Sequence, residues 1–203
     1  MYLPAHFKLT DPAEIADLVS HAPLATLISH SDRGLRADHI PLLMVKNRLI
    51  GHIAAANDLH EILPAEHPVL AVFVADESYI SANWHPSKGE THEIVPTWNY
   101  EVVHVHGTIT FNHDPRAKRG AVGQLTKLME RRLNGDDAWR MADAPDAYID
   151  DSLARIVSFE IKIDRIEAKA KLSQNELQGD VLGVSKGLES IEKTRMAQRV
   201  KGP

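Results

Sequence analysis

Apolar and polar residues alternate along several stretches of the chain, and this alternation predicts β-strands. In the stretch 100–111, Val103, Val105 and Ile109 occupy odd positions, whereas all the even positions except Val102 carry Tyr, His or Thr side chains. Successive side chains of a strand point to opposite faces, so this stretch predicts a half-buried strand. Other stretches rich in β-forming residues are bounded by turn residues and predict further strands. They are 24–30, 35–45, 48–55, 77–84 and 156–172.

One further stretch, 69–75, reads VLAVFVA and is almost entirely apolar. A short apolar run without alternation is typical of a strand that is buried on both faces. We therefore expect this strand to lie near the centre of the sheet.

Two helices are indicated by their starting residues. Asp11 and Pro12 match an N-cap and a first helical position, and an amphipathic stripe continues to about residue 22. Asp114 and Pro115 repeat that start, and this helix should end near Asn134. Its inward residues are expected to be Ala121, Leu125, Leu128 and Met129. Shorter helices are expected within 57–64 and 135–156.

The order of these elements predicts a mainly β fold with peripheral α-helices. The strands follow one another through short turns and do not alternate with long helices, so a doubly wound parallel sheet is disfavoured. An antiparallel barrel decorated by helices fits the pattern best.

Composition narrows the class of protein. The 203 residues are 43% hydrophobic and include no cysteine, so the chain can bury a core but cannot form disulfides or thiolate metal sites. No stretch reads as a signal peptide or a membrane span, and we expect a soluble, cytoplasmic protein without a membrane partner. The net charge of −5 provides no overall attraction to nucleic acid.

Common catalytic motifs are absent. The sequence contains no G-x-S-x-G, no G-x-G-x-x-G after a strand, no P-loop and no H-E-x-x-H. Hydrolase elbows, dinucleotide folds and nucleotide-triphosphate sites are therefore disfavoured, and no catalytic residue is assigned.

Two groups of residues leave alternatives open. His104 and His106 should lie about 7 Å apart on one strand face, but no third ligand follows in sequence, so they are either polar residues of a sheet face or subunit contact or, less favourably, metal ligands. We assign no metal. The helix from Pro115 is rich in Lys and Arg, which either form a solvated face or contact DNA phosphates.

Aromatic residues gather in the segment 84–100. Trp84 is followed by two histidines and a lysine, and Trp98 is followed by Asn99 and Tyr100. This mixture suits a flat aromatic ligand with a polar edge and an anionic tail, and it equally suits a loop that tryptophans anchor to the sheet.

Several blocks together resemble one known family. They are MYLPAHF, HIPLL, GHIAAAN, YISANWHPSK, VPTWNYEVVHVHG and KLSQNELQGDVLGVSKGLE. Their order and spacing, from Met1 to about Glu189, are similar to those of the PaiB-type proteins, which are described as FMN-binding negative transcriptional regulators. VPTWNY with the following H-x-H-G strand and KLSQN is the most specific combination.

The resemblance implies an antiparallel split β-barrel of the FMN-binding, pyridoxamine-phosphate-oxidase-like type, assembled as a homodimer. It places the barrel in residues 1–189 and leaves 190–203 as a tail with helical character. FMN is the implied cofactor, and Lys88 and Lys171 are implied phosphate or partner-subunit contacts. The implied FMN-binding residues are Asp38, His39, Ile40, His52, Asn57, Lys88, Thr97, Trp98, Asn99, Tyr100 and Lys171.

The chain departs from the family pattern in one block. Where relatives usually read GHLARANPQWR, this sequence has Ala55, Asp58, His60 and Glu61, and Glu176 stands where KLSQN is normally followed by arginine. If the lost arginine contacts the FMN phosphate, its absence removes about 1.5 to 3 kcal/mol of charge-assisted hydrogen bonding.

The function that the resemblance implies is that of an FMN-binding negative transcriptional regulator, for which DNA is one candidate partner. The alternative is a flavin-dependent oxidoreductase that acts on a small molecule, in which the cofactor carries the chemistry. A third reading, a haem-handling split barrel, would use an exposed histidine as axial ligand.

Overall fold

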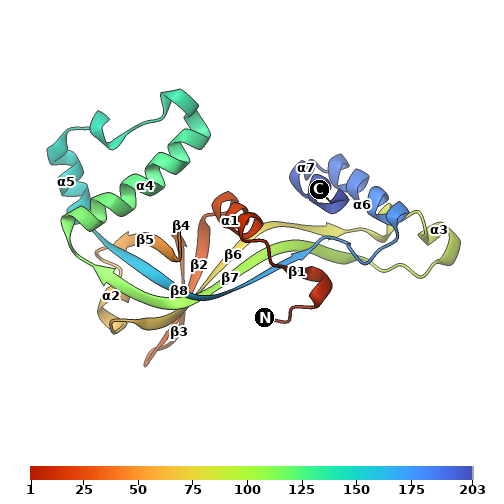
Figure 1. Ribbon diagram of the computed structural model, residues 1–203, viewed down its shortest axis with the longest axis horizontal. Coiled ribbons are helices and arrows are strands. Elements are labelled where there is room, and N and C mark those ends of the chain that lie inside the picture. The colour runs from red at the N-terminus through yellow and green to blue at the C-terminus, as the bar shows by residue number, and fades with distance from the viewer. Residues whose placement is uncertain (203) are drawn as a thin grey trace. The chain divides into compact units, whose positions relative to one another are not determined.

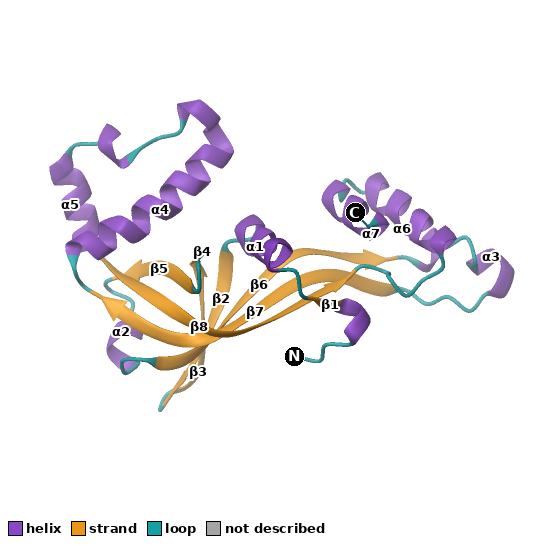
Figure 2. Cartoon of the chain, viewed as in Figure 1, coloured by secondary structure: helices purple, strands orange, loops and turns teal. Residues whose placement is uncertain are grey.

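The computed structural model describes residues 1–202, which divide into two compact units. Unit 1 comprises Met1–His21, Val74–His104 and the chain from Glu167 onward, and unit 2 comprises Ala22–Phe73 and Val105–Ile166. Figure 1 traces the chain, and Figure 2 distinguishes its strands from its helices by colour. The predicted mainly β class with flanking helices is confirmed.

The strands pair antiparallel wherever their register is defined. Their hydrogen-bonded order is β3-β2-β6-β7-β8-β5-β4, with β1 beside β8. The strands are β1 (Lys8–Leu9), β2 (Leu24–Ser31), β3 (Gly34–Pro41), β4 (Leu43–Val45), β5 (Arg48–Ala54), β6 (His67–Ile80), β7 (Thr97–Asn112) and β8 (Ile156–Lys171).

The helices occupy the connections and the C-terminal region. The α-helices are α1 (Pro12–His21), α2 (Leu59–Ile62), α3 (Lys88–Thr91), α4 (Pro115–Asn134), α5 (Asp146–Ala154), α6 (Gln178–Ser190) and α7 (Thr194–Lys201). Short 3-10 turns are η1 (Ala5–Phe7), η2 (Ala82–Trp84), η3 (Gly135–Asp137) and η4 (Met141–Asp143).

In unit 1, α6 and α7 cover one face of the sheet. A buried cluster joins strand residues to helix residues. Its members are Ile80, Ala170, Leu172, Val184, Leu188, Met196, Ala197 and Val200, with Trp84 and Val181 packed against it. Gly187 is required here, because a Cβ at this position would lie 2.1 Å from the Trp84 ring. The opposite face of these strands contacts the N-terminal segment, because Lys169 Nζ donates to the Tyr2 carbonyl and lies over the rings of Tyr2 and Phe7.

Ion pairs between a buried carboxylate of β7 and two arginines of α7 attach this helix to the sheet of unit 1. Glu101 on β7 has a side chain with 0% exposure and accepts hydrogen bonds from Arg195 at 2.9 Å and from Arg199 Nε at 2.9 Å. Because a buried carboxylate is costly unless it is paired, these two arginines account for its position.

In unit 2, β2 and β3 form a hairpin whose register runs from Leu24↔Pro41 to Ser31↔Gly34, and β5 pairs with β8 from Arg48↔Lys162 to Ala54↔Ile156. Their inward residues form the core of this unit. It includes Ala25, Leu27, Ile40, Leu49, Ile53, Ala71, Phe73, Val105, Ile109, Val157, Phe159 and Ile161.

Three expectations require correction. The sheet is not closed into a barrel, because the hydrogen-bonded path ends at β3 on one side and β4 on the other. The stretch 69–75 belongs to β6 but is not buried on both faces, since Val74 is 52% exposed. Helix α4 has the expected bounds but buries no residue, so its apolar stripe is only partly covered. In addition to these three corrections, helix α6 is an element that the sequence did not predict, because its glycines obscure the helical pattern.

Candidate functional site

The face of the unit 1 sheet opposite α6 and α7 is partly exposed and carries aromatic and cationic side chains. Along β7, Asn99 and Glu101 are buried on the face covered by α6 and α7, so Trp98 and Tyr100 project from the other face. Along β8, Ala170 lies in the helix-covered core, so the neighbouring Lys169 and Lys171 share the face of Trp98. We call Tyr79, Trp98, Tyr100, Lys169 and Lys171 the aromatic–lysine face.

Two rings on this face are exposed. Trp98 is 50% exposed and Tyr79 is 49% exposed, and their ring centroids lie 6.1 Å apart in an edge-to-face arrangement. Large exposed aromatic side chains that contact each other form an apolar platform onto which a planar molecule can stack.

Two lysines contact residues of this face through hydrogen bonds. Lys171 Nζ donates hydrogen bonds to Thr97 Oγ1 at 2.5 Å and to the Trp98 carbonyl at 2.6 Å. Lys169 Nζ donates to the Tyr100 hydroxyl at 2.7 Å and lies over the rings of Tyr2, Phe7 and Tyr100. Burial lowers the pKa of Lys171, and the positive charge of Lys169 lowers it further. An anion bound between the two ammonium groups would relieve this repulsion.

Asn99 has a different position from the one expected. Its side chain is fully buried, and its Nδ2 donates to Ser173 Oγ at 2.9 Å. Ser173 adopts a left-handed backbone conformation with φ of 64°, which is unfavourable for a residue with a side chain. Asn99 therefore braces the turn that follows β8, and it lies on the opposite face of β7 from Trp98.

Lys88 is not brought to this group by any described contact. It lies on the short helix α3, and its Nζ donates to Asn83 Oδ1 at 2.5 Å. Thr97, Trp98, Tyr100 and Lys171 are thus the expected residues that unit 1 places together.

The expected residues of unit 2 gather around an arginine. Asp38 accepts from Arg36 Nε at 2.8 Å and from Asn57 Nδ2 at 3.1 Å, and Asn57 Oδ1 accepts from Arg36 at 2.9 Å. Asp58 also accepts from Arg36 and from Arg33. Arg36 lowers the pKa of Asp58, and the carboxylates of Asp38 and Asp58 raise the pKa of Arg36. The charge of Arg36 is therefore already neutralised by this chain's own carboxylates.

The remaining expected residues of unit 2 differ in accessibility. His39 is exposed, whereas the Ile40 side chain is buried, so only the backbone of Ile40 could contact a ligand. His52 on β5 has a buried Nδ1 atom without a hydrogen-bond partner among residues 1–202, and burial lowers the pKa of its imidazole. A buried nitrogen without a hydrogen-bond partner is unusual in a folded protein, and it marks a place where a ligand could donate or accept a hydrogen bond.

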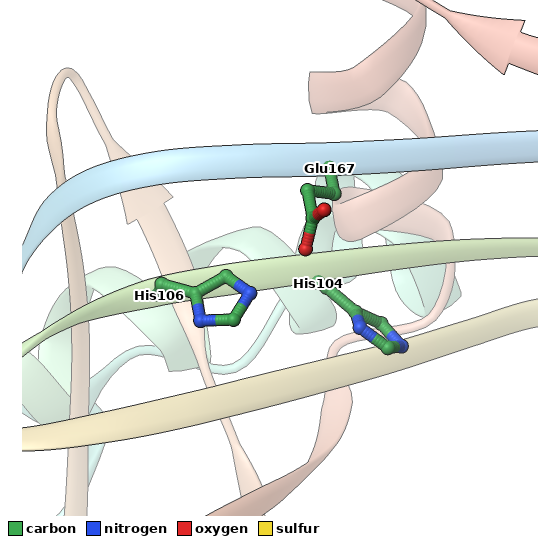
Figure 3. Close-up of side chains that lie close together, drawn as sticks. All are labelled: His104, His106 and Glu167. Carbon is green, nitrogen blue, oxygen red and sulfur yellow. The ribbon is translucent and has the colours of Figure 1, made fainter. Parts of the chain in front are cut away.

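His104, His106 and Glu167 lie close together on the neighbouring strands β7 and β8, as Figure 3 shows. Their potential ligand atoms all lie within 4.8 Å of one another, so Glu167 is the third group that the sequence did not reveal. However, both Glu167 oxygens accept from the Met1 ammonium group at 3.1 Å, and an Arg165 nitrogen lies 3.2 Å from His106 Nδ1. A divalent ion would have to enter beside these positive charges, which opposes its binding.

Three residues that contribute to these two groups of side chains were not identified from the sequence. Arg36 could have been found, because it lies two positions from Asp38 and therefore shares its strand face. Lys169 could also have been found, because it lies two positions from Lys171 and therefore shares its strand face. Tyr79 could not have been found, because its contact with Trp98 joins two strands whose register the sequence does not specify.

Together these features define a class: an antiparallel β-sheet protein with flanking helices and a partly exposed aromatic–lysine face. Residues 1–165 match the family described as "Putative FMN-binding domain". The chain belongs to this family of FMN-binding domains, and the cofactor that the family assigns is the flavin FMN. No helix within residues 1–202 combines the length and apolar character needed to cross a membrane.

Known proteins support this assignment. The chain is 30% identical to "Protease synthase and sporulation protein PAI 2" of Bacillus subtilis, over 98% of this chain and 94% of that protein. Among solved structures, the conserved hypothetical protein Rv2991 from Mycobacterium tuberculosis matches with a TM-score of 0.62 and 13% identity, covering 87% of this chain and 94% of that one. The FAD and heme binding protein from Mycobacterium smegmatis matches with a TM-score of 0.60 and 20% identity, covering 81% and 73%. At these identities, the structural matches show the fold.

Proposed function

We propose that this protein is a homodimeric, FMN-binding regulator of transcription whose flavin ring stacks on the aromatic–lysine face. The observation that carries the proposal is the pair of half-exposed rings, Trp98 and Tyr79, which share one sheet face with Lys171 and with the buried Lys169. The rings suit the isoalloxazine, and Lys171 and Lys169 suit the anionic phosphate tail.

The residues present fit the cofactor in chemical type. Bound FMN would supply reversible electron transfer, while the protein binds the ring, orients it and limits its contact with water. Lys171 would reorient from Thr97 toward a phosphate oxygen, and Tyr100 would keep Lys169 in place. The orphaned nitrogen of His52 and the backbone near His39 form a second candidate set in unit 2.

The regulatory role rests on the resemblance to PaiB-type proteins and on the charge of α4. This helix carries Arg116, Lys118, Arg119, Lys127, Arg131 and Arg132 but only Glu130 as an acidic residue within its bounds. A basic helix can contact DNA phosphates without reading sequence. DNA binding by this helix is therefore part of the proposal.

A flavin-dependent oxidoreductase is the second candidate, and the openness of the face favours it. Because Trp98 and Tyr79 are about half exposed, a ring stacked there would remain reachable by a small second substrate.

The first experiment is a visible spectrum and mass spectrometry of the molecule released from the purified protein. We expect FMN. Bleaching of the flavin absorbance by NAD(P)H would favour the oxidoreductase, whereas a salt-dependent shift of promoter DNA would favour the regulator.

The site itself is tested by Trp98→Ala. Stacking of a planar ring on an aromatic side chain contributes about 1–3 kcal/mol, so FMN affinity should fall roughly 5- to 150-fold. Tyr148→Ala removes an aromatic side chain of unit 2 that is 62% exposed, and it should leave affinity unchanged. Unchanged affinity in Trp98→Ala would exclude the aromatic–lysine face and leave the His52 set as the candidate.

A further inference from the structure

We propose that unit 2 contains a second binding pocket, distinct from the flavin site, that takes a small aromatic zwitterion such as a free aromatic amino acid. The pocket is lined by residues of α4 and of the segment that follows it. Figure 1 shows this segment turning back toward α5. Its volume is about 660 Å³, within the range of roughly 300–1,000 Å³ typical of small-molecule sites. It is lined by Gly123, Thr126, Lys127, Arg131, Gly135, Asp136, Asp137, Ala138, Trp139, Arg140, Met141 and Asp143.

Hydrogen bonds hold the loop wall of this pocket in place. Glu130 on α4 accepts from Asn134 Nδ2 at 2.8 Å and from the Trp139 backbone N–H at 3.1 Å. Asp143 accepts from the Arg140 backbone N–H at 2.8 Å and from its guanidinium at 3.2 Å. The wall is therefore largely formed before any ligand arrives, which reduces the entropy lost on binding.

Opposite charges line the pocket without neutralising one another. Lys127 and Arg131 lie four residues apart and so share one face of α4, and Asp136 and Asp137 come from the following turn. None of these four side chains has an ion-pair partner within residues 1–202, whereas Arg140 and Asp143 pair with each other. The pocket thus offers two cations to a carboxylate and two carboxylates to an ammonium group.

The apolar part of the lining suits a single ring. Trp139 is 41% exposed, and the Met141 thioether also lines the pocket. An indole face and a polarizable sulfur both contact aromatic rings favourably. FMN fits less well, because it has no ammonium group to pair with Asp136 and Asp137.

Glycine keeps the floor of the pocket open. Gly123 lies within α4, where glycine weakens a helix relative to alanine, yet a Cβ there would meet only the Met141 sulfur, at 3.4 Å. Packing within the chain therefore does not require glycine at this position. Gly120, one turn earlier, has nothing within 4 Å of its Cβ position and lines a different groove, so it provides a matched control.

The test is calorimetric titration of the full chain with three probes. L-phenylalanine has both charges, 3-phenylpropionate lacks the ammonium group, and 2-phenylethylamine lacks the carboxylate. We expect saturable binding of L-phenylalanine and at least about tenfold weaker binding of the other two, because each loses one charge-assisted contact.

Variants locate the site. Gly123→Leu should fill the pocket and lower L-phenylalanine affinity at least about tenfold, whereas Gly120→Leu should change it less than about twofold. Arg131→Gln should weaken L-phenylalanine and 3-phenylpropionate but not 2-phenylethylamine. FMN retention should be the same in all three variants and in the unmodified protein.

Two results would overturn the proposal: absence of saturable L-phenylalanine binding by the unmodified chain, or equal affinities of Gly123→Leu and Gly120→Leu. Loss of FMN from Gly123→Leu with retention in Trp98→Ala would instead place the flavin in this pocket, which would refute both this inference and the aromatic–lysine site. If only Trp98→Ala loses FMN, the flavin lies on the aromatic–lysine face. The titrations with L-phenylalanine then decide whether the second pocket binds its own ligand.

Discussion

Replacing Glu101 by glutamine removes one negative charge from the contact between β7 and α7. The Glu101 carboxylate has 0% exposure and accepts from Arg195 at 2.9 Å and from Arg199 at 2.8 Å. Glutamine keeps the size of the side chain but leaves the two guanidinium groups without their shared partner, and one amide hydrogen would face a cation.

The magnitude follows from this burial. Removing one partner of a buried ion pair typically costs about 3–5 kcal/mol. Arg195 retains Asp76 and Arg199 retains Glu14, and both arginines are about a quarter exposed, at 27% and 26%. We therefore expect the lower end of the range, about 3 kcal/mol, which for a chain of this size lowers Tm by roughly 6–12 °C.

Urea and thermal unfolding followed by circular dichroism provide the measurement. Glu189→Gln is the control, because Glu189 on α6 is 47% exposed and pairs with Lys201 on α7 at 2.8 Å. Such a surface pair contributes only about 0–1 kcal/mol. A loss of stability in Glu101→Gln no greater than that in Glu189→Gln would refute the view that the buried carboxylate fastens α7.

Two further predictions concern residues of the expected site. Asn99→Ala should lower the free energy of unfolding by about 1–3 kcal/mol, because it leaves the buried Ser173 hydroxyl without its partner, but it should not change FMN affinity; a selective loss of FMN would contradict its bracing role. Burial lowers the pKa of His52 below its usual value, so the unfolded chain binds more protons and folding stability falls as the pH drops below about 6.5. Unfolding measured between about pH 7.5 and about pH 5 should show a smaller loss of stability in His52→Asn than in the unmodified protein, and equal slopes would contradict this assignment.

The position of Asn99 shows that a sequence motif does not determine which face of a strand is covered. In the stretch PTWNY all residues looked like candidates for one site, because their types suit a flavin and they adjoin one another. A strand sends adjacent side chains to opposite faces, so Trp98 and Asn99 could not both face the same ligand. The alternation was readable from the sequence, but which face would be covered by α6 and α7 was not.

Asp38 and Asn57 illustrate a second limit. Residue type made both plausible cofactor contacts, and the structure shows that both hold Arg36 together with Asp58. Asp58 is one of the departures from the family pattern, and its pairing with Arg36 and Arg33 depends on where the segment after β5 meets β3. Arg36 and Asp58 are 22 residues apart in the sequence, and strand pairing decides whether they meet.

The sequence by itself determined the local structure: long half-buried strands, helices that begin at Asp-Pro pairs, and a family whose cofactor is FMN. These features depend on side-chain periodicity, capping chemistry and motifs, all of which act over short distances along the chain. Only the tertiary structure decided that the sheet stays open, that Tyr79 joins Trp98, and that Glu101 binds two arginines of α7. The physical reason is that these contacts depend on strand register and on which surface each helix covers, and both are set by burial summed over the whole chain.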